Sequence, residues 1–140
     1  MKFIIIGAAA LMAAGTPASA SEMLAGPYNA QVLRVIDGDT VEARVRLWLD
    51  QDLTVRVRLR GIDAPEMHED CADAAEASRT ALTRLLGAGA VTLTRISYDK
   101  YGGRVDAALS LADGRDVSAV MLSGGYARRW PKGKGVAGCP

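Results

Sequence analysis

Two short segments of the chain carry carboxylates close together, and the second of them also carries an arginine. Asp37 and Asp39 flank a glycine in the first segment. In the second, Asp63 and Glu66 follow Arg58 by five and eight residues. Carboxylates from two segments can hold one hard cation through oxygen ligands, as calcium prefers, and arginine offers a planar fork that grips phosphate. If the two segments meet in the fold, these residue types suit the cleavage of a phosphodiester bond.

This chemistry accounts for each residue type in the second segment. Attack on a phosphodiester adds negative charge to the phosphate oxygens, so arginine and a divalent cation favour the transition state over the ground state. A carboxylate beside the cation and a water molecule can accept the water's proton. Pro65 precedes Glu66 and fixes one backbone angle, which helps to set the distance between cation and base. Asp-Gly-Asp-Thr at 37–40 taken alone is also an ordinary acidic turn.

The first twenty residues are typical of a cleaved secretory signal. Lys2 precedes an apolar run over 3–14, and Pro17-Ala18-Ser19-Ala20 follows it. A membrane anchor is the alternative, but this run is shorter than the ~20 residues that span a bilayer. We therefore expect a signal peptide over 1–20, one domain over 21–140, no membrane anchor after cleavage, and export to the periplasm or the medium.

Charge and cysteine content narrow the class of protein further. Without Lys2, Lys+Arg falls from 17 to 16 and equals the 16 Asp+Glu, so the net charge of the mature protein would be close to zero. A polyanion would therefore have to bind to a local basic patch. Cys71 and Cys139, in an exported chain without a His/Cys ligand cluster, predict one disulfide rather than a zinc site or a redox CxxC pair. Two free thiols are the alternative. We expect a monomer.

The elements that must position these residues follow from hydrophobic periodicity. Strands are expected over 30–36, 41–49 and 53–60, with Leu47, Leu49 and Leu53 on the inward face and Arg58 on the other. A helix is expected between Asp70, as N-cap, and Gly87. Strands over 91–96 and 105–111 and a second helix capped by Asp116 complete the pattern. This order predicts a mainly β fold with helices (α+β), a five-stranded OB-type barrel with two or so packed helices.

Three ordered motifs also resemble one family. Val35-Ile36-Asp37-Gly38-Asp39-Thr40, Val57 to Glu66 (VRLRGIDAPE) and Asp99-Lys100-Tyr101-Gly102-Gly103-Arg104 occur in the order of the staphylococcal-type nucleases (thermonucleases). The likeness covers nearly the whole predicted mature chain, which resembles the short exported bacterial members. It implies an OB-fold nuclease that uses calcium and hydrolyses DNA, RNA or both to 3'-phosphate ends.

The resemblance also implies a role for each matching residue. Asp39, Asp63 and the carbonyl of Ala64 would be calcium ligands; Glu66 would be the general base; Arg58 and Arg104 would hold the phosphate; Lys100 and Tyr101 would contact a terminal phosphate. Gly103 is one residue more than the family pattern has before its arginine. Short exported relatives pair a cysteine near the first helix with one at the extreme end, as Cys71 and Cys139 would.

Two other classes of protein remain open at this point. One is an OB barrel that binds single-stranded nucleic acid without cutting it. The other is an exported domain that calcium only stabilises, for which the arginines are unnecessary. Magnesium or manganese would suit the same oxygen ligands.

Overall fold

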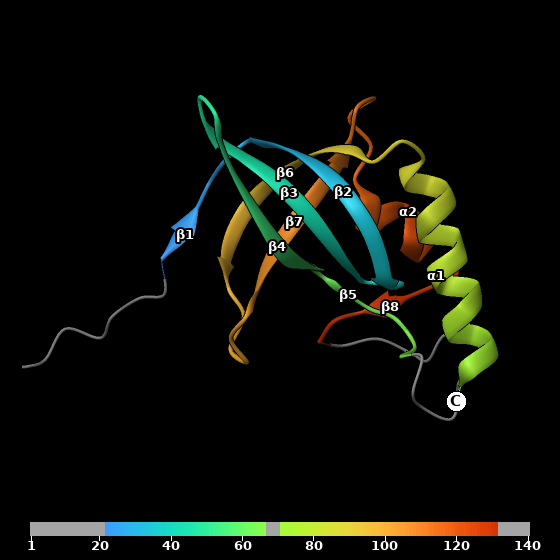
Figure 1. Ribbon diagram of the computed structural model, residues 1–140. Helices are drawn as coiled ribbons and strands as arrows, with labels where there is room; N and C mark the ends of the chain where they lie inside the picture. Colours follow the sequence, from blue (N-terminus) through green and yellow to red (C-terminus); the bar gives the residue numbers. More distant parts are fainter. Residues whose placement is uncertain (1–21, 67–70, 132–140) are drawn as a thin grey trace, which may run out of the picture.

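A closed five-stranded barrel forms the centre of the computed structural model, which describes residues 22–66 and 71–131 (Figure 1). Strand β2 pairs with β3, β3 with β4, and β6 with both β2 and β7, all antiparallel. The parallel pair β4–β7 closes the circle. This is the OB-type arrangement that the sequence predicts. The barrel strands are β2 (Tyr28–Asp37), β3 (Thr40–Trp48), β4 (Gln51–Leu59), β6 (Ala90–Tyr98) and β7 (Arg104–Leu111).

Three two-residue strands were not expected from the sequence. β1 (Met23–Leu24) adds to β6, while β5 (Ile62–Asp63) and β8 (Arg128–Arg129) pair antiparallel as a separate sheet. Two residues are too few to show a period of two, so no hydrophobic pattern marks them. In Figure 1, β5 and β8 lie beside the turn between β2 and β3, at one end of the barrel.

Two helices are present among the described residues, α1 (Ala72–Leu86) and α2 (Val117–Ser123). Asp116 caps α2 as expected, because its side chain accepts a hydrogen bond from the Ala119 N–H at 2.8 Å. Gly87 ends α1. The expected N-cap of α1 is wrong: Cys71 takes that place instead of Asp70 and makes no side-chain cap bond. Neither described helix is long and apolar enough to cross a bilayer.

The core lies inside the barrel and under α1. Val41, Val57 and Leu59 are fully buried, as the alternation in β3 and β4 predicts. Of the three leucines expected on the inward face at the β3–β4 hairpin, Leu47 and Leu53 line the apolar mouth of the barrel. The inward placement of Leu49 is wrong, because β3 ends at Trp48 and Leu49 lies in the turn that follows. The exposed fractions are 46% for Leu47, 79% for Leu49 and 50% for Leu53.

Candidate active site

The turn between β2 and β3 is packed tightly against α1. A Cβ atom on Gly38 would lie 1.8 Å from Ser78 Oγ and 3.0 Å from Ala64 Cβ, so only glycine fits there. Ser78 in turn donates a hydrogen bond to the carbonyl of Tyr126 at 2.8 Å. The turn, α1 and the segment before β8 are thereby fixed to one another, and the turn's acidic residue is held in place.

That residue, Asp39, is buried, with 7% of its surface exposed. Its Oδ1 accepts from the Thr40 hydroxyl at 2.8 Å and its Oδ2 from the Ala64 N–H at 2.9 Å. Burial raises the pKa of Asp39, and the nearby Asp63 charge adds to that effect; the two hydrogen bonds and Arg58 act against it. A cation bound beside this carboxylate would stabilise its charged form, which burial disfavours.

Asp39, Asp63 and Arg58 meet at one place, although they lie in the turn after β2, in β5 and in β4 respectively. Arg58 Nη2 lies 3.5 Å from Asp63 Oδ1 and 3.9 Å from Asp39 Oδ2. Arg58 projects from the outer face of β4, yet only 17% of its side chain is exposed. The structure therefore brings together the two acidic segments and the arginine that the sequence singled out.

Two further residues, Arg128 and Trp130, reach this cluster and were not among the predicted site residues. Arg128 donates to Asp63 Oδ2 from Nε at 2.9 Å and from Nη2 at 2.7 Å. The Trp130 ring centroid lies 5.9 Å from the guanidinium carbon of Arg58. Neither belongs to the quoted motifs. The sequence signal that could have found them is weak: a basic segment after Tyr126 in which Arg128 and Trp130 are two positions apart.

Ala64 follows Asp63 directly, and Glu66 lies three positions after it. Ala64 and Pro65 are buried, and the Glu66 side chain lies at the surface. The predicted base is therefore accessible to water.

The loop from 99 to 104 carries the other predicted residues. Arg104 is hydrogen-bonded through Nε to Asp99, and its guanidinium carbon lies 5.8 Å from the ring centroid of Tyr101. Lys100 Nζ lies 4.8 Å from the same ring. Strands β4 and β7 are neighbours, and Arg104 lies opposite Arg56 in the register, two residues before Arg58.

The donor set fits a hard cation that takes its other ligands from water and substrate. No group of three or more His, Cys, Asp and Glu side chains gathers within 22–66 and 71–131. Two carboxylates, those of Asp39 and Asp63, lie within 3.9 Å of the same Arg58 nitrogen, and the backbone carbonyl of Ala64 follows directly in the chain. All three are oxygen donors of the kind that calcium accepts.

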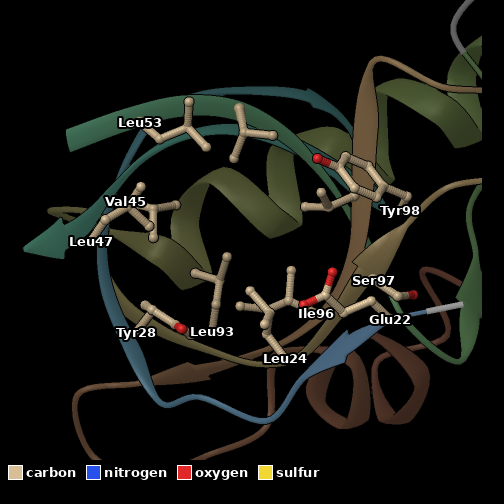
Figure 2. Close-up of a pocket in the computed structure, with 12 residues that line it drawn as sticks. Glu22, Leu24, Tyr28, Val45, Leu47, Leu53, Leu93, Ile96, Ser97 and Tyr98 are labelled. Atoms are coloured by element: carbon tan, nitrogen blue, oxygen red, sulfur yellow. The ribbon is translucent and has the colours of Figure 1, made fainter. Parts of the chain in front are cut away.

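An apolar cavity of about 230 Å³ lies elsewhere, at the mouth of the barrel (Figure 2). Figure 2 shows Tyr28, Val45 and Leu93 pointing into it. None of the predicted catalytic or cation-binding residues lines it. Its lining is mostly apolar, so the cluster around Asp39 and Asp63 remains the candidate active site.

Some predictions fall outside the described residues. Cys139 lies there, and so does the whole of the predicted signal peptide over 1–20. The Cys71–Cys139 disulfide and export therefore stay predictions.

Comparison with known proteins points the same way as the geometry. A family model described as staphylococcal nuclease homologue matches residues 56–135, which include Arg58, Asp63, Glu66 and Arg104 but not Asp39. A protein of Escherichia coli named "Uncharacterized endonuclease" is 33% identical over 105 residues, which is 75% of this chain and 63% of that protein. A protein of Shigella flexneri named "Micrococcal nuclease" is 31% identical over 129 residues, 87% of this chain and 66% of that protein. The chain thus spans just under two thirds of the length of these curated relatives.

Proposed function

The chain belongs to the family of staphylococcal nuclease homologues, and on that premise we propose that it is a nuclease that hydrolyses phosphodiester bonds of DNA, RNA or both and leaves 3'-phosphate ends. The observation that carries the proposal is the meeting of Asp39, Asp63 and Arg58 at distances of 3.5 and 3.9 Å. A binding protein gains nothing from two carboxylates where an anionic backbone must lie, whereas a hydrolase that uses a cation needs them.

Calcium is the cation that we propose for the site. Asp39, Asp63 and the Ala64 carbonyl would hold it, and magnesium or manganese would meet the same donors. Bound there, the ion would neutralise charge that builds on the phosphate in the transition state.

Glu66 is the proposed general base. Its carboxylate takes a proton from a water molecule, the water oxygen forms a bond to phosphorus, and the bond from phosphorus to the 5' oxygen breaks. The leaving 5' oxygen takes a proton from solvent, Glu66 releases its proton to solvent, and the phosphate stays on the 3' side. The exposed position of Glu66 gives it access to the attacking water.

Arg58 and Arg104 are proposed to stabilise the charge on the phosphate oxygens. A guanidinium carries five N–H donors in a fixed fork, so Asp99 can hold Arg104 through Nε while the other donors face a phosphate. Lys100 and Tyr101, on the same loop, are proposed to contact a terminal phosphate of the substrate.

Export as a monomer completes the proposal. The export is supported by the charged and then apolar segment over 2–14 followed by Pro17-Ala18-Ser19-Ala20. A cell that exports the enzyme to the periplasm or the medium keeps its own nucleic acids out of reach.

The test is cleavage of denatured DNA and of RNA by the purified protein, with added calcium or with a chelator. Shortening of the strands with calcium and none with chelator is expected, and end analysis should find 3'-phosphates. Binding of either nucleic acid without shortening, across calcium concentrations and pH values, would instead identify a single-stranded nucleic-acid binding module.

A further inference from the structure

Arg128 and Trp130 contact two different members of the candidate site from one short segment. Arg128 donates two hydrogen bonds to Asp63 Oδ2, at 2.9 and 2.7 Å. Trp130 lies over the guanidinium of Arg58, 5.9 Å from its ring centroid to the guanidinium carbon. The two residues are two positions apart, and in extended chain such residues share one side. Arg129, between them, belongs to the opposite side.

The segment is docked by its backbone rather than by these side chains. Strand β8 pairs with β5, with Asp63 opposite Arg128 and Ile62 opposite Arg129. The Trp130 N–H donates to the Gly61 carbonyl at 3.0 Å. Because main-chain bonds place the segment, its side chains can be changed one at a time while the strand remains in position.

The two oxygens of Asp63 have different surroundings. Oδ2 accepts both hydrogen bonds from Arg128, whereas Oδ1 lies 3.5 Å from the Arg58 nitrogen that also approaches Asp39. Oδ1 is thus the oxygen that shares an Arg58 nitrogen with Asp39, and Arg128 holds the carboxylate by its other oxygen. Residues that orient a metal ligand in this way commonly affect metal affinity about 10-fold to 100-fold.

We propose that residues 128–130 brace the site at two points: Arg128 is a positioning residue that aims Asp63 at the cation, and Trp130 is a positioning residue that holds Arg58 against the phosphate. This inference rests on the proposed function and adds to it two residues with separable effects. The first contact acts on cation binding. The contact of Trp130 with Arg58 acts on turnover, because it limits the orientations of the Arg58 guanidinium. That guanidinium must face the phosphate with two N–H donors to stabilise the charge that develops there.

The experiment compares four variants of the purified protein, Arg128→Gln, Arg128→Lys, Trp130→Leu and the matched control Arg129→Gln. Calcium affinity is measured by titration calorimetry. The constants kcat and KM are measured on denatured DNA, and the melting temperature is measured without calcium. We expect Arg128→Gln to weaken calcium binding about tenfold or more and Arg128→Lys to give an intermediate affinity. Trp130→Leu should leave calcium affinity unchanged and lower kcat about threefold to tenfold. Arg129→Gln should match the unmodified protein throughout.

Several results would overturn the brace. Unchanged or tighter calcium binding in Arg128→Gln would mean that Arg128 does nothing for Asp63 or competes with the ion. A Trp130→Leu effect confined to KM would place Trp130 on the substrate. If Arg128→Gln and Trp130→Leu lowered the melting temperature, the calcium affinity and the turnover to the same extent, the segment would contribute only to packing. If Arg128→Gln does not fold, Arg128→Lys decides, and full affinity in it counts against the proposal.

Failure of the brace is distinguishable from failure of the proposed function. If the unmodified protein binds calcium and cuts DNA while the variants match it, only the brace is wrong. If the unmodified protein neither binds calcium nor cuts, the nuclease proposal fails and the two positioning roles fail with it.

Discussion

Asp99 and Arg104 hold each other across the turn that joins β6 to β7. Arg104 donates from Nε to Asp99 Oδ2, and the backbone N–H of Asp99 donates to the Arg104 carbonyl at 3.1 Å. The Tyr101 N–H donates to Asp99 Oδ1 at 3.0 Å. Burial acts to raise the pKa of Asp99, but these hydrogen bonds and the charges of Arg104 and Arg58 outweigh it and hold the pKa below its usual value.

Asp99→Asn should therefore destabilise the protein in a pH-dependent way. A carboxyl whose pKa is lower in the folded than in the unfolded state stabilises the fold above its ordinary pKa of 3.8, and that contribution is lost as the pH falls through the folded-state value. We expect a loss of about 2 kcal/mol at pH 7 that shrinks below pH 3.8. Urea denaturation over a pH series measures it, and a loss independent of pH would contradict the assignment.

Glu66→Gln should separate binding from cleavage. The amide keeps the size and shape of the side chain but cannot accept the proton of the attacking water, so turnover should fall about 100-fold or more. Affinity for calcium and for single-stranded DNA should stay close to that of the unmodified protein. Rates come from single-turnover cleavage and affinities from titration. Full cleavage activity in this variant would keep the enzyme and remove Glu66 from its mechanism.

Asp39→Asn and Asp63→Asn should each abolish calcium-dependent cleavage, because each removes one of the two anionic ligands. Asp52→Asn, on the β3–β4 hairpin, is the control, since Asp52 pairs with Arg46 away from the site. Calorimetry should find calcium affinity reduced in the first two variants and unchanged in the third. Wild-type calcium affinity in either site variant would show that the cation binds elsewhere.

A disulfide between Cys71 and Cys139 should be present in the exported protein. Closing a loop of this length contributes up to about 4 kcal/mol in the chain-entropy model. Thiol labelling of the unfolded, unreduced protein should find no reactive cysteine, and reductant should lower the melting temperature. Two labelled thiols per chain would rule the disulfide out.

The sequence predicted what depends on local pattern. Alternation in β3 and β4 marked Val41, Val57 and Leu59 as core, and the acidic motifs marked Asp39 and Asp63. Exposure of Leu49 could not be foreseen, since it depends on where β3 ends. Nor could the contact of Arg128 with Asp63, because it arises from two-residue strands far apart in the chain.

The hydrogen bonds between Arg128 and Asp63 join residues 65 positions apart in the chain. Contacts of such separation form slowly, because the entropy of closing the loop is lost before the contact stabilises anything. During synthesis, a growing chain that already contains Asp39, Arg58 and Glu66 still lacks the partner of Asp63. The contacts that we propose to position Asp63 and Arg58 can therefore form only after residue 130 has been added and β8 has paired with β5.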